Sequence, residues 1–187
     1  MNVLDLFSGC GGISSGFAQA GYQIKAGIDF DKDSIDTFSE NFKDALAICA
    51  DLNSYSENDI FNQFEQLDIQ VVVGGPPCQG FSIANKKSGD SKDPRNSLFQ
   101  DFVRVGKLLN PKIMIMENVP NIIKARTASN ELVVDIICQQ LEELGYRVKY
   151  KILSATDYGV PQIRKRLVII ASKIELKDYF PAATHTI

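Results

Sequence analysis

One cysteine of this chain lies in a segment that could present a reactive thiol. Three valines, Val71–Val73, lead directly into the segment Gly74–Ser82 (GGPPCQGFS). Its glycines let the backbone approach a ligand closely, and its prolines stiffen the turn. Because α/β enzymes bind ligands at the ends of parallel strands, Cys78 could act there as a nucleophilic thiolate. A proline-rich surface turn that carries a small apolar side chain would explain the same residues equally well.

An acid and two arginines follow other strand-like segments. Glu117 ends the apolar run that starts at Ile113, and a carboxyl group there could be kept protonated and act as an acid. Arg164 and Arg166 alternate on an extended segment, so their side chains point the same way and could converge on a planar anion or carbonyl. The alternatives are a glutamate paired with a nearby basic side chain and two separate surface charges.

A glycine-rich turn near the start of the chain could hold a cofactor. The segment Asp5–Gly12 (DLFSGCGG) joins a strand-like run to a helical one, although turns of this kind serve many cofactors. Asp29 follows about 20 residues later, where an acid can bind ribose hydroxyls, and Phe30 beside it offers a flat apolar face. Asp51 could accept a hydrogen bond from an adenine amino group. These residues favour a cofactor that contains adenosine, with NAD as one option, but each aspartate could instead be a helix N-cap.

The elements that must position these residues alternate between two patterns. Short apolar runs predict strands, and apolar residues every three or four positions predict helices. The predicted strands are Asn2–Leu6, Gln23–Ile28, Leu46–Cys49, Ile69–Val73, Ile113–Met116, Arg147–Leu153 and Leu167–Ala171. The predicted helices are Ile13–Ala20, Lys32–Phe42, Asp59–Phe64, Leu98–Leu109 and Leu132–Leu144. This alternation indicates an α/β, Rossmann-like fold: a mostly parallel sheet with helices on both faces.

The connections of this fold predict where the site lies. No helix separates the last two strands, so we expect the sheet to end in an antiparallel hairpin. Right-handed crossovers place the loops from strand to helix on one edge of the sheet. Two of these loops, Gly74–Ser97 and Asn118–Asn130, are longer than the fold needs, which is typical of functional segments.

Length and composition limit the class of protein. The 187 residues fit one domain, residues 1–187, and 44% hydrophobic with 23% charged residues is typical of a soluble globular protein. No apolar stretch is long enough to span a membrane and no leader precedes the first strand, so we expect a cytoplasmic location. The net charge of −3 argues against nonspecific binding of polyanions by the whole chain. Basic residues nevertheless cluster in three predicted loops, at Lys86, Lys87, Lys92 and Arg95, at Lys124 and Arg126, and at Arg164–Arg166.

The cysteines do not predict a metal site. Cys10, Cys49, Cys78 and Cys138 show no CxxC spacing, and His185 is the single histidine of the sequence. We therefore expect neither a zinc site nor a disulfide framework, and we expect most of these cysteines to be reduced residues of the core.

Four blocks of residues together resemble the C5-cytosine DNA methyltransferases in order and spacing. The blocks are Asp5–Gly12 with Gly16-Phe17, Gly75–Ser82, Glu117–Val119 and Gln162–Arg166, and the resemblance extends from Asn2 to His185. It implies transfer of a methyl group from S-adenosylmethionine to C5 of a cytosine in double-stranded DNA, in the setting of restriction-modification. The target base of this family is flipped out of the duplex.

The resemblance also implies a role for each matching residue. Cys78 would be the nucleophile that adds to C6, Glu117 would contact N3 and the exocyclic amine, and Arg164 and Arg166 would hold O2 and orient Glu117. The implied cofactor-binding residues are Phe7, Gly9, Gly11, Gly12, Asp29 (more often Glu in the family), Phe30, Asp51, Leu52, Gly75, Pro77 and Leu98. No metal is implied. The loop Gln79–Asn96 would close over the flipped base and contact phosphates.

The chain departs from the family pattern after Ile187. Family members continue into a target-recognition region and a block that completes the catalytic domain, so we expect an incomplete catalytic domain whose remainder lies in a missing C-terminal region or a second subunit. Weak or no methylation, low stability or self-association of this chain alone would follow. The competing interpretations are a tRNA cytosine-5 methyltransferase, a noncatalytic subunit that binds cofactor, and a dehydrogenase, which has no use for the Pro-Cys turn.

Overall fold

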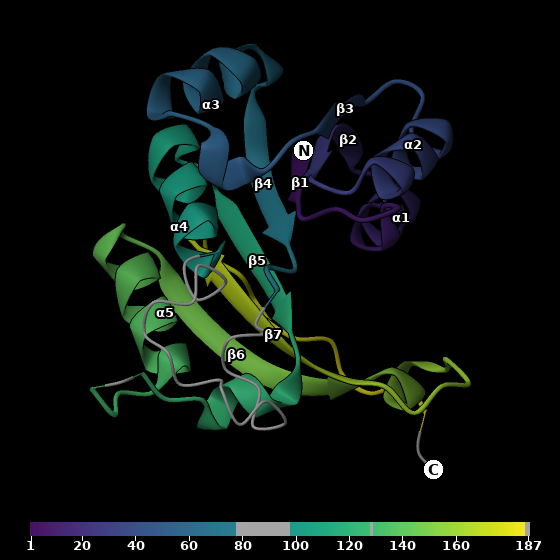
Figure 1. The fold of residues 1–187 in the computed structure, drawn as a ribbon. Helices are drawn as coiled ribbons and strands as arrows, with labels where there is room; N and C mark the ends of the chain where they lie inside the picture. Colours follow the sequence, from purple (N-terminus) through teal and green to yellow (C-terminus); the bar gives the residue numbers. More distant parts are fainter. Residues whose placement is uncertain (78–97, 128, 186–187) are drawn as a thin grey trace.

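A seven-stranded sheet organises the chain in the computed structural model, which describes residues 1–77, 98–127 and 129–185 (Figure 1). Its strands are β1 (Asn2–Leu6), β2 (Gln23–Asp29), β3 (Leu46–Cys49), β4 (Ile69–Gly74), β5 (Ile113–Asn118), β6 (Arg147–Ser154) and β7 (Lys165–Ser172). The α-helices are α1 (Gly12–Gln19), α2 (Lys32–Asn41), α3 (Glu57–Phe64), α4 (Leu98–Leu109) and α5 (Val133–Glu143). Short 3₁₀ helices η1 (Leu52–Ser54), η2 (Glu65–Leu67), η5 (Pro120–Lys124) and η6 (Ala155–Tyr158) join them.

The strand order is β3-β2-β1-β4-β5-β7-β6. Strands β1 to β5 pair in parallel, and β7 runs antiparallel to both β5 and β6. The predicted mostly parallel sheet and its final antiparallel hairpin are therefore confirmed. The order reverses between β1 and β4, because β2 and β3 extend the sheet on one side of β1 and β4 and β5 extend it on the other. Open α/β sheets bind ligands at such a switch point.

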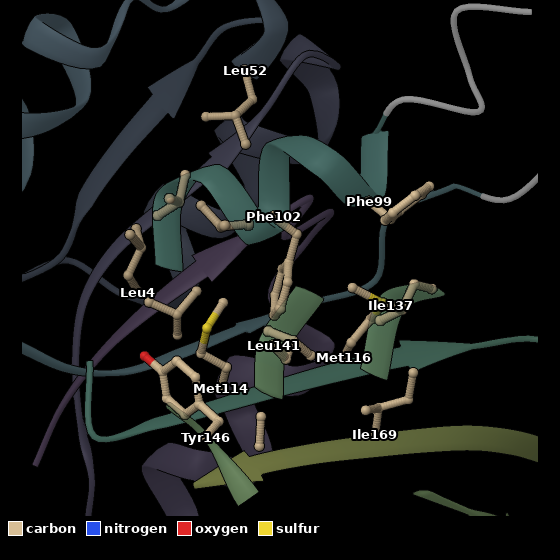
Figure 2. Close-up of a cluster of buried hydrophobic side chains, with 14 of the residues drawn as sticks. Leu4, Leu52, Phe99, Phe102, Met114, Met116, Ile137, Leu141, Tyr146 and Ile169 are labelled. Atoms are coloured by element: carbon tan, nitrogen blue, oxygen red, sulfur yellow. The ribbon is translucent and has the colours of Figure 1, made fainter. Parts of the chain in front are cut away.

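Helices cover both faces of the sheet, as predicted. On one face α3, α4 and α5 bury the larger apolar cluster, in which Phe102 of α4 points toward Met114 and Met116 of β5 (Figure 2). On the other face a smaller cluster forms around Val3, Val71 and Val73 and includes Ile13 and Phe17 of α1. The near-continuous apolar strands are thus explained by burial on both faces.

The long connection after β5 is more regular than its length predicts. Residues Pro120–Lys124 form η5 and bury Ile122, and Arg126 makes an isolated antiparallel bridge with Leu132. The other long connection, Gly74–Ser97, lies mostly outside the described residues. Cys78, the basic cluster at 86–95 and the loop Gln79–Asn96, which was predicted to close over the flipped base, lie outside them as well. Among the described residues, no helix is both long and apolar enough to cross a membrane.

The cysteines correct one prediction. Cys10, Cys49 and Cys138 are free thiols, but Cys10 and Cys49 are exposed and Cys138 is half-buried, so the expectation of core cysteines is wrong for the first two. Cys10 lies in the glycine turn after β1, and Cys49 ends the edge strand β3. A side chain in a turn or at the end of an edge strand is less enclosed than one in the middle of a central strand, which explains the exposure.

The junction of β1 and β4 requires glycine at one position. Leu6 pairs with Gly74, and a Cβ atom added to Gly74 would lie 2.4 Å from the carbonyl oxygen of Leu6. Real Cβ atoms do not approach backbone oxygens so closely, so any side chain at this position would push the two strands apart. Glycine at residue 74 therefore sets how closely the segments that follow β1 and β4 can approach each other.

Replacing Gly74 by alanine should destabilise the fold. The overpacking at Leu6 predicts a loss of about 1–3 kcal/mol in the free energy of unfolding, measured by urea denaturation. The matched control is Gly75→Ala, whose added Cβ would meet, among the described residues, only Glu117 atoms at 3.5 and 3.7 Å, an ordinary contact. The control should stay within about 0.5 kcal/mol of the wild type. Equal losses for the two variants would show that β1 and β4 can separate freely.

Candidate functional site

The ends of four parallel strands bring the predicted site residues to one edge of the sheet. Leu6 of β1 lies beside Ile28 of β2 and Gly74 of β4, and Gly74 lies beside Met116 of β5. The residues that follow each strand end must therefore lie close together. These residues are Phe7, Asp29, Gly75 and Glu117, each of which was predicted from the sequence to belong to the site.

The turn after β1 is held in an unusual backbone conformation. Phe7, Gly9 and Gly11 have φ angles of 58°, 53° and 90°, a region that glycine enters readily and other residues rarely enter. A Cβ on Gly11 would also lie 2.4 Å from the ring of Phe42, so this residue must be glycine. The Gly9 amide donates to Asp29 Oδ2 at 2.8 Å, which fastens the turn to the end of β2.

The hydrogen bonds of Asp29 and Asp51 test whether each residue is a helix N-cap. Helix α2 is capped by Asp31, which accepts from the Ser34 amide, so the N-cap alternative for Asp29 is wrong. Asp29 instead accepts from the Gly9 and Asp31 amides, one on each oxygen. Each carboxylate oxygen has two lone pairs, so capacity remains for hydroxyl donors of a ligand. Asp51 does cap a helix, the short η1, by accepting from the Asn53 amide.

A narrow hollow opens beside Asp29 on the β2 and β3 side of the switch point. It is lined by Phe7, Ile28, Asp29, Phe30, Ala50, Asp51, Leu52, Pro77 and Leu98. Sequence analysis had missed Ile28 and Ala50, which carry no polar group that would mark them. The Phe30 ring is 71% exposed, so a flat apolar surface is open to solvent at the mouth of the hollow. The predicted Gly9 and Gly11 lie in the adjoining turn and Gly12 begins α1, and none of the three lines the hollow.

The predicted acid and arginines meet on the other side of the switch point. Arg166 Nε lies 2.8 Å from Glu117 Oε1, and Arg164 Nη2 lies 3.8 Å from the same oxygen. The antiparallel pairing of β7 with β5 carries the arginines to Glu117. The two guanidinium groups point the same way, as the alternation of Arg164 and Arg166 predicts, and both approach the Glu117 carboxylate. Glu117 in the free chain therefore matches the alternative of an ion-paired glutamate, with its direction fixed by Arg166.

Asn118 is a residue that the sequence analysis did not single out. Its buried side chain donates from Nδ2 to the carbonyl oxygen of Pro76 at 2.9 Å and accepts from the Val119 amide at 2.8 Å. It therefore ties the strand of Glu117 to the Pro76-Pro77 turn. The partners Asn118 and Pro76 are far apart in the sequence, so no local pattern predicts the contact. Cys78, the predicted nucleophile, follows this turn directly and lies outside the described residues.

A buried acid lies beneath the glycine turn. Asp5 is 1% exposed, its Oδ2 accepts from the Ser14 hydroxyl at 2.6 Å, and its Oδ1 has no hydrogen-bond partner among the described residues. Burial raises the pKa of Asp5 to about 7; the bonds from Ser14 oppose this shift, and the charge of Asp29 adds to it. Within the described ranges, no group of three or more His, Cys, Asp or Glu side chains could hold a metal ion.

Comparisons with known proteins agree on one family. A family model described as C-5 cytosine-specific DNA methylase matches residues 1–186. Type II methyltransferase M.DdeI of Desulfomicrobium norvegicum is 44% identical over 92% of this chain and 41% of its own length. Type II methyltransferase M1.HphI of Haemophilus parahaemolyticus is 41% identical over 100% of this chain and 50% of its own length. The solved Entamoeba histolytica methyltransferase EhMeth is 26% identical with a TM-score of 0.76, covering 100% of this chain and 57% of that one. The chain thus spans about half the length of these proteins.

Replacing Asp5 by asparagine should flatten the dependence of stability on pH. The folded chain keeps the Asp5 proton up to a pH of about 7, whereas the unfolded chain releases it near the ordinary pKa of 3.8. The free energy of unfolding of the wild type therefore falls as the pH rises through this window, by at most about 1.4 kcal/mol per pH unit, and levels off above it. An asparagine can still accept the Ser14 bond but does not titrate.

Urea denaturation of both proteins at several pH values measures this effect. The difference in the free energy of unfolding, variant minus wild type, should become steadily more positive as the pH rises toward about 7. Parallel profiles for the two proteins would contradict a buried, protonated Asp5.

Proposed function

Because the chain belongs to the C-5 cytosine-specific DNA methylase family, we propose that it forms part of an enzyme that methylates C5 of cytosine in double-stranded DNA. The observation that carries this proposal is the shared edge of the sheet. There, a glycine turn and an apolar hollow on one side adjoin an acid held by two arginines on the other. The proposed cofactor is S-adenosylmethionine. Target recognition would come from a region or a second subunit beyond this chain, which spans about half of its curated relatives.

The side chains around the hollow are of the types that would bind the adenosine part of this cofactor. The exposed Phe30 ring offers a face on which adenine can stack, and Leu98 and Pro77 supply apolar walls. Asp51 would accept from the adenine amino group, and Asp29 would accept from ribose hydroxyls with its remaining lone pairs. Gly9, Gly11 and Gly12 would line the path of the remainder of the molecule, with Gly75 on the side of β4. When bound, the cofactor supplies a methyl group on a sulfonium.

The residues of β4, β5 and β7 would handle the base. Cytosine C5 is a poor nucleophile until a group adds at C6, and the thiolate of Cys78 would make that bond. Glu117 would contact N3 and the exocyclic amine, so that a proton at N3 draws charge from the ring during the attack. Arg166 bonds the Glu117 carboxylate at 2.8 Å and would keep it in one direction, and Arg164, 3.8 Å from the same carboxylate, would contact O2 of the base. After methylation, a water molecule would accept the proton from C5 and the Cys78 sulfur would leave C6 as a thiolate, which restores the aromatic ring.

Replacing Cys78 by serine should abolish a covalent adduct with DNA that contains 5-fluorocytosine. Fluorine at C5 cannot leave as a proton does, so the Cys78–C6 bond persists in the wild type and survives denaturing electrophoresis. The matched control is Cys49→Ser, which removes the exposed thiol at the end of β3 and should keep the adduct. Both variants should bind S-adenosylhomocysteine, measured by calorimetry, within about twofold of the wild type.

A methyl-transfer assay distinguishes duplex DNA from tRNA as the substrate. The chain is assayed alone and together with the C-terminal region that its relatives possess. Each sample receives tritiated S-adenosylmethionine and either duplex DNA or tRNA, and the tritium transferred to the nucleic acid is measured. We expect labelling of duplex DNA, much stronger with that region present. An adduct that persists after Cys78→Ser would refute the nucleophile, and labelling of tRNA alone would refute DNA as the substrate.

A further inference from the structure

A partly buried arginine lies behind the hollow, among residues that the proposed function does not use. Arg104 of α4 donates from Nη1 to the carbonyl oxygen of Tyr55 at 2.6 Å and from Nη2 to that of Leu52 at 2.8 Å. Its Nη2 also donates to Asp101 Oδ1, one turn earlier on the same helix, at 2.8 Å. One guanidinium group therefore holds both ends of the short helix η1.

The segment that Arg104 holds is a wall of the hollow. Asp51 and Leu52 line the hollow at the start of η1, and Leu98, the first residue of α4, lines it as well. Leu52 lies over α4 (Figure 2) and belongs to the same apolar cluster as Phe102. The bonds of Arg104 therefore fix the distance between two walls, one built by η1 and the other by α4.

The direction of the Asp51 carboxylate depends on η1. Asp51 accepts from the Asn53 amide with its side chain, and its carbonyl oxygen accepts from the Ser54 amide and hydroxyl. A helix of three residues has too few internal bonds to hold this geometry without outside support. Arg104 supplies that support from α4. Its guanidinium group is planar and carries several N–H donors in a fixed geometry, so it can bond two carbonyl groups at once.

The partner of Arg104 is unusually buried for a charged group. Asp101 is 7% exposed, and its Oδ2 has no hydrogen-bond partner among the described residues. Burial raises the pKa of Asp101, the hydrogen bond and charge of Arg104 oppose that shift, and the charge of Asp51 adds to it. The last effect shows that Asp51 lies within electrostatic reach of the pair. A buried pair of this kind gives little net stability, so a structural role alone explains it poorly.

We propose that Arg104, oriented by Asp101, is a positioning residue that sets the wall Asp51–Leu52 against Leu98 and so determines the affinity for the adenosine part of the cofactor. This inference rests on the proposed function. Arg104 itself lies outside the lining of the hollow and acts through η1.

Replacing Arg104 by lysine tests the proposal, because a lysine keeps the charge but cannot bond both carbonyl groups in the same geometry. Binding of S-adenosylhomocysteine, measured by calorimetry, should weaken by about tenfold. In the free variant, amide hydrogen exchange should quicken in residues 51–56 and stay unchanged in β4. The matched control is Lys107→Gln, an exposed residue of the same helix, which should change neither quantity.

A double-mutant cycle separates positioning from general support of the fold. If Arg104 acts through Asp51, then Arg104→Lys should cost less affinity in an Asp51→Asn background than in the wild type. Equal costs in both backgrounds, or an Arg104→Lys variant that binds as tightly as the wild type, would overturn the positioning role.

If Arg104→Lys does not fold, the test uses Asp101→Asn instead. This variant keeps an acceptor for Arg104, and an unchanged affinity would overturn the proposal. A wild type that does not bind S-adenosylhomocysteine would refute the proposed cofactor and this role together.

Discussion

The close approach of β1 and β4 is the constraint on which the site depends. These strands lie side by side at the switch point, and their ends meet where Leu6 pairs with Gly74 with no room for a side chain at residue 74. The turn that follows β1 and the Pro-Pro turn that follows β4 therefore start from almost the same place. A sheet with a wider gap here would separate the residues proposed to bind the cofactor from those proposed to contact the base.

Different bonds hold the two sides of the site in place next to the junction of β1 and β4. On one side Asp29 holds the glycine turn through the Gly9 amide, and Arg104 holds the next wall through the Leu52 carbonyl. On the other side Asn118 holds the Pro76 carbonyl, and Arg166 fixes Glu117. In each case a polar side chain from one element bonds a backbone group or a charge on its neighbour. The geometry thus depends on contacts between elements more than on the elements themselves.

This dependence explains what the sequence could and could not predict. Strands β4 and β5 were predictable because their apolar runs are nearly continuous, and the hairpin was predictable because no helical pattern separates β6 from β7. The choice between Asp29 and Asp31 as the cap of α2 was not predictable, since both residues precede the helix and only the backbone geometry selects Asp31. Asn118 and Arg104 were missed because their partners lie 42 to 52 residues away in the sequence. The exposure of Cys49 likewise depends on which strand forms the edge of the sheet.

The central claim is that the carboxyl edge of the parallel strands binds the adenosine cofactor. A larger hollow, about 460 Å³, lies at the opposite edge between the starts of β2 and β3 and is lined by residues that include Lys25 and Phe42. Titration of the ¹⁵N-labelled chain with S-adenosylhomocysteine distinguishes the two edges by NMR. Binding at the carboxyl edge predicts amide shifts concentrated in residues 7–12, 29–30 and 50–52. Shifts concentrated in residues 23–25 and 41–45, or no shifts at saturating ligand, would contradict it.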